Sequence, residues 1–316
     1  MGSKPKLFRY RSDGQYSVDS ALKGKMYFVC PVELNDPFEF YIKYDIDKVF
    51  QIIRQDLKAK TIVSKMLFEH AYTFGDIGGP VSPPRTTDEC IKMFDDAAKV
   101  SKIKQSLKKR IEDRIIQFKE SFGIVSLTEN PTEPVMWSHY TNDSKGFLEI
   151  YDAELIIWNF KSYLNYISQE YTNMQMDAIG IHRVNYVKDF KERNELVVKL
   201  LCTEVKPDCN IGVEFIDDEE TAKQVLEIAT SKLLPWKYEK EIRLILPCDI
   251  YKINRKKTND GKIIHDHFFE FTPSQPTKIV LGYKGNIELE YALKYYCAKN
   301  NISFEKSSDT FAFEID

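Results

Sequence analysis

The segment Trp236-Lys237-Tyr238-Glu239-Lys240-Glu241-Ile242-Arg243-Leu244 combines strand-forming residues with a line of charged ones. Successive side chains of a β-strand point to opposite faces. As a strand, this segment would place Glu239, Glu241 and Arg243 on one face and its aliphatic residues on the other. An arginine keeps a neighbouring carboxylate ionised and oriented, which suits holding ribose hydroxyls or stabilising positive charge on a sugar. A row of cross-strand salt bridges on a solvated face would give the same pattern.

Outward from this segment, the chain alternates between short strand patterns and longer helical ones. Strand patterns occur at residues 8–11, 25–30, 123–128, 146–151, 183–187, 239–246, 267–271, 278–281 and 302–306. Helical spacing of apolar residues predicts helices over about 45–72, within 91–118, and at 218–233 and 288–299. Strands without regular helical crossovers indicate an α+β fold rather than a doubly wound sheet. With no long linker, we predict one α+β domain over residues 1–316, with a helical insertion at about 45–120.

The composition argues against several classes of function. The chain has 45 Lys and Arg against 48 Asp and Glu, a net charge of −3, which disfavours holding nucleic acid mainly by bulk electrostatics. Six cysteines are scattered without a Cys-x-x-Cys pair, so we expect free thiols in a reducing cytoplasm and no bound metal. The N-terminal residues lack the apolar run of a signal peptide, and no stretch of about 18 apolar residues occurs. We therefore expect a cytoplasmic protein with no membrane partner.

A second candidate segment is Pro134-Val135-Met136-Trp137-Ser138-His139-Tyr140, which lies between a strand pattern and a glycine. Trp137 and Tyr140 suit the aromatic wall of a ligand cleft. His139 is the best candidate among five histidines for an acid, a base or a polar contact. A core tryptophan beside a histidine that caps a turn is the alternative. Ser138 lacks the glycine pattern of a nucleophile elbow, which argues against a serine hydrolase.

The N-terminal part of the chain supplies cationic groups. Arg9 and Arg11 share one face of the expected strand at 8–11, and a pair of guanidiniums can bind phosphates with two hydrogen bonds each. Surface charge near a terminus is the alternative explanation. Further along, Asn35-Asp36-Pro37 is a strong turn signal, and it follows the aromatic strand that contains Tyr27.

In order, the segments LFRYR, KMYFVCPVELNDPFEF, FGIVSLTE, MWSHYTNDSKGF, WKYEKEIRL and KIVLGYKGN resemble the bacterial family catalogued as domain of unknown function 2971. The resemblance extends from about Leu7 to Lys306. The combination of NDPFE, MWSHY and YEKEIR carries it. One departure is Cys30, where a small hydroxyl residue is expected after the aromatic strand.

More distantly, the chain resembles the ADP-ribosyltransferase superfamily, whose members bind NAD in a cleft between two small twisted sheets. An early strand with a basic residue, a second strand with an aromatic one and a late strand with Glu-x-Glu carry this resemblance. It implies that Arg9 or Arg11 binds the phosphates and ribose of NAD. It further implies that Tyr27 packs on nicotinamide and that Glu241, or else Glu239, is the catalytic glutamate.

The resemblance thus implies an enzyme that consumes NAD as a substrate. We expect a bacterial toxin or defence effector that transfers ADP-ribose to nucleic acid or protein, controlled by an antitoxin or a sensor partner. The other candidate residues are His139 for catalysis and Asn35, Asp36, Trp137, Tyr140 and Arg243 for binding. Two alternatives use the same sequence features. One is an NAD or nucleotide glycohydrolase, and the other is a non-catalytic module that binds nucleotide or nucleic acid.

Overall fold

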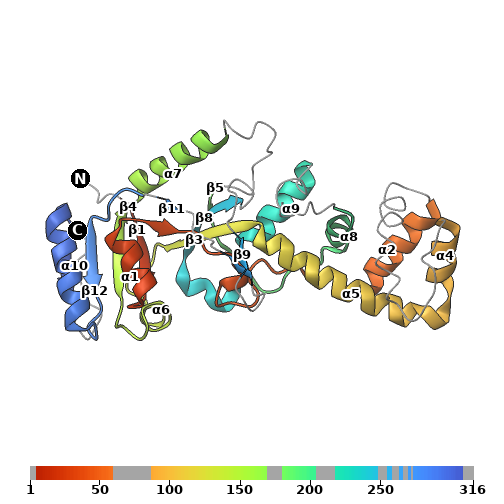
Figure 1. Ribbon diagram of the computed structural model, residues 1–316, viewed down its shortest axis with the longest axis horizontal. Coiled ribbons are helices and arrows are strands. Elements are labelled where there is room, and N and C mark those ends of the chain that lie inside the picture. The colour runs from red at the N-terminus through yellow and green to blue at the C-terminus, as the bar shows by residue number, and fades with distance from the viewer. Residues whose placement is uncertain are drawn as a thin grey trace.

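The computed structural model describes residues 5–59, 87–168, 180–203, 218–247, 255–257, 263–265, 270–271 and 273–308. Its helices are α1 (Gln15–Leu22), α2 (Ile46–Ala59), α4 (Thr87–Asp95), α5 (Ala97–Glu120), α6 (Pro134–Tyr140), α7 (Ala153–Ser168), α8 (Asn194–Cys202), α9 (Glu219–Thr230) and α10 (Ile287–Asn300). Two 3₁₀ helices, η1 (Pro31–Glu33) and η3 (Leu234–Glu239), accompany them. The mixed α+β class expected from the sequence is confirmed (Figure 1).

The described strands belong to one large sheet and several short ribbons. They are β1 (Lys6–Arg11), β2 (Met26–Tyr27), β3 (Phe122–Thr128), β4 (Phe147–Asp152), β5 (Gly180–Arg183), β6 (Asn185–Val187), β7 (Ser231–Leu233), β8 (Glu241–Pro247), β9 (Arg255–Lys257), β10 (Ile263–His265), β11 (Glu270–Phe271), β12 (Lys278–Leu281) and β13 (Ser303–Lys306). The large sheet has the order β13-β12-β4-β1-β3-β8-β5. Within it, β12 and β13 run parallel and the other neighbours run antiparallel.

The large sheet is almost divided between β1 and β3. The neighbouring pairs β1–β4 and β3–β8 are in register along their whole length, whereas β1 and β3 share the single pair Phe8↔Thr128. At the other end of β3, the edge that faces β1 is taken by Val29, whose backbone exchanges two hydrogen bonds of 2.8 Å with Ile124. The two halves of the sheet therefore diverge from one point of contact.

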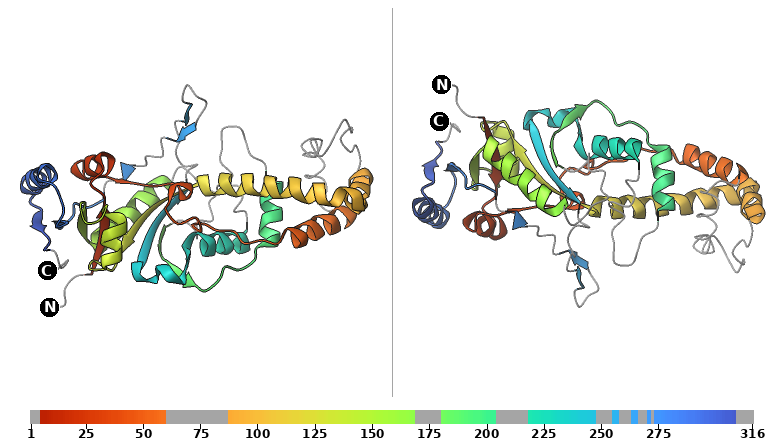
Figure 2. Two further views of the ribbon diagram at one scale, coloured as in Figure 1. Left: turned by 90° about the horizontal axis from the view of Figure 1, so that it is seen from below. Right: turned by 90° about the horizontal axis from the view of Figure 1, so that it is seen from above.

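Helices cover the sheet and also form a long arm. One apolar cluster joins β3 and β8 to α7 through residues such as Val125, Leu244 and Phe160, and another packs α10 against β12. A third and larger cluster joins α2, α4, α5, α8 and α9 to Phe122 and Ile124 of β3. Figures 1 and 2 show α5 running from the sheet to the far end of the molecule, where α2 and α4 lie.

The helices α2 and α5 agree with the spacing of their apolar residues. In α2, Val49, Phe50, Ile53 and Leu57 are buried along one stripe, as an amphipathic helix requires. The helix predicted over 45–72 is described as far as Ala59, and its remainder lies outside the described residues. In α5, which ends one residue before β3, the buried residues are Ile103, Leu107, Ile111 and Phe118.

Several elements differ from the sequence expectation. Residues 134–140 form a helix, with Pro134 in its first turn, where a missing N–H costs nothing. The helices α1, α7 and α8 were not predicted. The helix expected over 218–233 ends at Thr230, because residues 231–233 pair with β6 as the parallel strand β7. The strand expected over 25–30 is reduced to β2 and the bridge at Val29.

Candidate functional site

A cavity of about 200 Å³ lies where the two halves of the sheet diverge. Its walls come from β1, β3, the loop that precedes α2, α6, β7, η3 and the start of β8. The charged residues of its lining are Arg9, Glu39, Lys232, Glu239 and Glu241. Ser126, Tyr140 and Asn35 supply further polar groups.

Glu241 begins β8, and its carboxylate is held by three side chains. Oε1 accepts hydrogen bonds from Ser126 Oγ at 2.6 Å and Arg243 Nε at 2.9 Å. Oε2 accepts from Arg243 Nη2 at 3.0 Å and from Lys232 Nζ at 3.4 Å. Burial alone would raise the pKa of this carboxyl, but the charges of Arg243 and Lys232 outweigh it and lower the pKa to about 2. Glu241 therefore stays ionised at any physiological pH.

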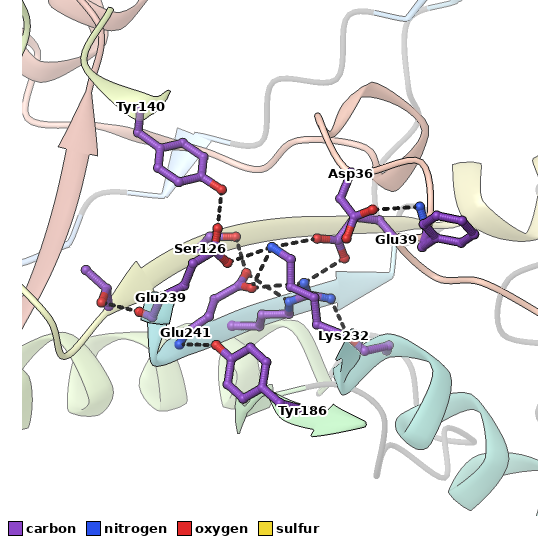
Figure 3. Close-up of polar contacts among 12 residues, drawn as sticks. Asp36, Glu39, Ser126, Tyr140, Tyr186, Lys232, Glu239 and Glu241 are labelled. Atoms are coloured by element: carbon purple, nitrogen blue, oxygen red, sulfur yellow. Dashed lines mark hydrogen bonds and ion pairs between the residues drawn. The ribbon is translucent and has the colours of Figure 1, made fainter. Parts of the chain in front are cut away.

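Two buried cations link Glu241 to two further carboxylates (Figure 3). Arg243, which is 0% exposed, donates through Nη2 to Glu39 Oε2 at 2.6 Å and through Nη1 to the carbonyl of Ala229 at 2.8 Å. Lys232 Nζ lies 2.7 Å from Glu239 Oε2 and 3.1 Å from Glu39 Oε1. Three carboxylates thus surround two cations, which leaves an excess of one negative charge when all five are ionised.

Glu239 differs from Glu241 in its environment. It lies in η3, before the strand, and the left-handed Lys240 (φ 44°) turns the chain so that both glutamates face the cavity. Its Oε1 accepts a hydrogen bond from the hydroxyl of Tyr140. Burial raises the pKa of Glu239, whereas the pKa of Glu241 is lowered. When the pKa values of two neighbouring carboxyls shift in opposite directions, the one with the raised pKa can carry a proton while the other remains a fixed negative charge.

Glu39 comes from the turn at residues 35–40, which the sequence marked by Asn35-Asp36-Pro37. Asp36 Oδ1 accepts the backbone N–H of Phe38 at 2.9 Å, and the carbonyl of Asp36 accepts the N–H of Glu39 at 3.0 Å. Phe40 follows with a left-handed backbone (φ 51°) and a fully buried ring, an uncommon conformation for a bulky residue. The turn is thereby anchored on both sides of Glu39.

Arg9 and Arg11 have different surroundings, although they share a strand face. Arg11 is buried and donates from Nε to Glu149 Oε2 at 2.7 Å and from Nη1 to Ser20 Oγ. Arg9 lines the cavity, and its buried Nη1 has no hydrogen-bond partner in the described part of the chain. Burial, with the charge of Arg11, lowers the pKa of Arg9 to about 10, so it remains a cation. Of the two arginines, Arg9 is therefore the one that borders the cavity and has a buried nitrogen without a hydrogen-bond partner among the described residues.

Of the other candidates from the sequence, Asn35 and Tyr140 line the cavity, and Arg243 supports it from behind. Five lie outside the lining. Arg11 is one, Asp36 anchors the turn described above, and Tyr27 pairs in β2 with Glu270. Trp137 is buried against Tyr10 and donates from Nε1 to the carbonyl of Pro131 at 3.2 Å. His139 is exposed, with its ring centroid 6.3 Å from that of Trp236.

Sequence reasoning missed Glu39, Ser126 and Lys232 as site residues. Glu39 and Ser126 lie inside two segments that carry the family resemblance, NDPFE and FGIVSLTE. The sequence thus pointed to these segments, but not to these two residues as site residues. Lys232 had no signal, because its position was assigned to the end of a helix. In the structure it is the central residue of β7, and its ammonium also lies 4.7 Å from the ring centroid of Trp236.

The described residues give no sign of a metal site or a membrane span. They contain no group of three or more His, Cys, Asp or Glu side chains placed to hold a metal ion. No helix among them is both long and apolar enough to cross a bilayer. Cys30, Cys202 and Cys297 are buried free thiols.

Residues 136–244 match the model of a family described as protein of unknown function (DUF2971). This stretch contains Tyr140, Lys232, Glu239 and Glu241 and excludes Arg9 and Glu39. No curated protein and no solved structure matches the chain. The family's description names no activity.

Proposed function

We propose that the chain is an ADP-ribosyltransferase-like enzyme that consumes NAD at the cavity between the two halves of the sheet. One observation carries the proposal: Arg9, Ser126 and Glu241, from β1, β3 and β8, line a single cavity. A cation for the diphosphate, a hydroxyl and a fixed carboxylate for the ribose are the groups that this chemistry needs. The near-division of the seven-stranded sheet between β1 and β3 supports the proposal, because a cavity opens between the two halves.

Arg9 supports the binding of an anionic substrate. A buried guanidinium nitrogen without a hydrogen-bond partner is costly, and the diphosphate of NAD would supply the missing acceptors. The excess negative charge of the Glu39, Glu239, Glu241, Lys232 and Arg243 cluster lies on the opposite wall. An elongated substrate with an anionic diphosphate and a cationic nicotinamide ring matches this separation of charge.

Glu241 would stabilise the transition state through its charge. When the bond between nicotinamide and ribose breaks, its electron pair leaves with nicotinamide, and positive charge develops on the ribose. A preorganised carboxylate stabilises that charge without accepting a proton, and the lowered pKa of Glu241 keeps it ionised. Ser126 and Arg243 hold the carboxylate in place.

Glu239 would handle the proton of the incoming group. The acceptor forms a new bond to the ribose carbon and must lose a proton, and Glu239 is the cavity carboxyl with a raised pKa. Tyr140 and Lys232 orient it. His139, which is exposed and lies beside the ring of Trp236, would contact the acceptor. Water as acceptor would make the same site a glycohydrolase.

A non-catalytic nucleotide-binding module is the second candidate, and one observation favours it. The two oxygens of Glu241 already accept four hydrogen bonds, which is the whole capacity of a carboxylate. Ribose hydroxyls would then have to displace a donor, and the 3.4 Å contact with Lys232 is the weakest one. A module that only binds nucleotide would retain the filled arrangement.

The test is incubation of the purified chain with NAD, with nicotinamide release followed by chromatography and DNA, RNA and protein acceptors present in parallel. We expect release by wild type, a loss of about a hundredfold or more in Glu241→Gln, and a smaller loss in Ser126→Ala. Glu154→Gln, on the exposed side of α7, is the matched control and should keep full activity. Circular dichroism of each variant separates loss of chemistry from loss of fold.

The products decide between the candidates. ADP-ribose attached to an acceptor supports the transferase, and free ADP-ribose supports the glycohydrolase. Binding of NAD without release, weakened in Arg9→Gln, would establish the binding module. If folded wild type neither binds NAD nor releases nicotinamide, NAD is not the substrate or ligand of this site.

A further inference from the structure

Four aromatic rings lie side by side on α6 and η3, next to the cavity. The ring centroids of His139 and Trp236 are 6.3 Å apart, and the ring of Tyr238 lies 6.1 Å from that of Trp236. Tyr140 completes the group, with its ring 6.4 Å from that of His139. His139 is exposed, and the other three side chains are partly exposed. These four residues form the aromatic rim.

Direct contacts join the aromatic rim to the cavity. Tyr140 lines the cavity, and its hydroxyl donates a hydrogen bond to Glu239 Oε1 (Figure 3). The ammonium of Lys232, which is paired with Glu239 and Glu241, also lies 4.7 Å from the ring centroid of Trp236. A ligand that stacks on the rim is therefore separated from the two glutamates by a single side chain.

Two cations stand beside the aromatic rim. Lys237 and Lys240 are exposed, and neither has an ion pair among the described residues. They belong to one turn, in which the N–H of Lys240 donates to the carbonyl of Lys237 at 3.4 Å. Trp236 and Tyr238 come from the same short helix. Positive charge and aromatic rings are thus presented together on one segment.

Rings next to closely spaced cations fit unpaired bases that are joined by phosphates. Aromatic side chains stack on the bases of a single strand, whereas the bases of a duplex are already stacked and paired. Lysines beside the rings would neutralise the phosphates. The net charge of −3 disfavours binding by bulk electrostatics, but stacking does not depend on net charge. A peptide offers neither regularly spaced phosphates nor a flat ring at every step.

We propose that the aromatic rim binds single-stranded nucleic acid, with one base stacked against His139 and Trp236. Lys237 and Lys240 contact the phosphates on either side of that base, and the strand presents its next base to Glu239. The binding site rests on the rim alone, whereas the role of the next base as acceptor of ADP-ribose rests on the proposed function. In that role, a nitrogen of the base forms a bond to the ribose carbon while nicotinamide leaves with the electron pair of the broken bond. The proton of that nitrogen passes to Glu239.

The first test is binding of a fluorescein-labelled single-stranded oligonucleotide to the full chain without NAD, followed by fluorescence anisotropy. Wild type should bind the single strand at least about tenfold more tightly than a duplex of the same sequence, and Trp236→Ala should weaken binding about tenfold, as expected for one lost stacking contact. His139→Ala, an exposed substitution away from the buried charges, should weaken it as well. Trp158→Ala removes a tryptophan that is 66% exposed on α7, and this matched control should bind as wild type does. A folded wild type that does not bind the strand, or binding that both rim variants retain in full, would overturn the proposal.

The salt dependence of binding tests the two lysines. Two phosphate contacts on a single strand predict a slope of about −1.4 for the logarithm of the association constant against the logarithm of salt concentration. Lys237→Gln and Lys240→Gln should each make the slope shallower by about 0.7. Lys161→Gln, the same change at an exposed lysine of α7, should leave it unchanged. A slope that neither rim variant alters would place the phosphates elsewhere and contradict the proposed contacts.

Transfer from NAD labelled in its adenosine half separates this inference from the proposed function. We expect label on the single-stranded oligonucleotide rather than on proteins in the same mixture, and less label with Trp236→Ala. Nicotinamide release without label on a bound strand, or label on protein instead, would exclude the base as acceptor and leave the NAD chemistry in place. Strand binding without any nicotinamide release would do the opposite, because it supports the binding site and removes the proposed function.

Discussion

The sheet contains two buried sets of charged side chains, and they differ in whether their positive and negative charges balance. On β1 and β4, Arg11 and Glu149 form one ion pair that Ser20 completes, away from the cavity. On β8 and its neighbours, two cations are shared among three carboxylates beside the cavity, with Arg9 on its other wall. A balanced, closed pair indicates a structural role. The unbalanced cluster, near an arginine whose buried Nη1 has no hydrogen-bond partner among the described residues, is the arrangement on which the proposed ligand site rests.

The largest expected effect is that of Arg243→Met. Its guanidinium is the partner of both Glu39 and Glu241 in a dry environment, so removal leaves two carboxylates without their main counter-charge. We expect a loss of about 3–5 kcal/mol in the free energy of unfolding, measured by urea denaturation with circular dichroism. A loss below about 1 kcal/mol would show that water reaches the cluster and that it is not a buried network.

The pair on β1 and β4 should respond differently to substitution. Arg11→Met alone removes the ion-pair partner of buried Glu149, with an expected loss of about 3 kcal/mol in the free energy of unfolding. Arg11→Met combined with Glu149→Met should recover most of that loss, because a closed pair can be replaced by apolar side chains. The corresponding double change of Arg243 and Glu241 should recover little, since Glu39 and Glu239 would then share Lys232 as their one ion-pair partner within the cluster. Equal recovery in the two double variants would contradict the comparison.

The pH dependence of the free energy of unfolding should reveal the contribution of ionised Glu241. Its pKa in the folded chain is about 2, below the ordinary value of 4.5. The unfolded chain therefore binds this proton more tightly, and the stability that ionised Glu241 contributes is present above about pH 4.5. It is lost as the pH falls towards 2, by about 3 kcal/mol. Denaturant titrations from pH 6 to 3 should show a steeper decline for wild type than for Glu241→Gln. Parallel declines would assign the acid sensitivity to other groups.

Glu239 should show a smaller effect of opposite sign. Burial raises the pKa of Glu239 in the folded chain, so its ionised form is less favourable there than in the unfolded chain. This cost is present above the raised pKa and disappears as the pH falls through it. Glu239→Gln should therefore be most favourable relative to wild type at neutral pH and lose that advantage in acid. Carboxyl NMR of wild type provides a direct check, because Glu239 should titrate above an ordinary glutamate.

Local patterns account for much of the fold. The strands at 122–128 and 278–281 and the helices around 46–59 and 287–300 were predicted because each has a clear periodicity over several residues. The helices α6, α7 and α8 were missed for different reasons. In α7 and α8, apolar residues such as Ile156, Phe160 and Leu200 dominate the sequence, which hides the contrast between two faces. In α6, the seven residues are too few to establish a period.

Some residues of the cavity lining were among the candidates named from the sequence. Glu239, Glu241 and Tyr140 were recognised because they lie in short segments with a distinctive chemistry, and the structure places all three on the cavity. Arg9 and Arg11 could not be distinguished, because alternation gives them the same strand face. The side chains on β4 distinguish them: Arg11 forms a hydrogen-bonded ion pair with Glu149, whereas the buried Nη1 of Arg9 has no hydrogen-bond partner among the described residues.

By itself, the sequence determined that Glu241 and Arg243 share a strand face with apolar residues behind them. Backbone geometry imposes this alternation on any strand, whatever surrounds it. Only the tertiary structure decided that Glu39, 204 residues away from Arg243, completes the cluster, and that Lys232 lies among three carboxylates. Such contacts depend on how separate elements pack, because the charges become partners only when the core around α9 and β8 removes water from between them.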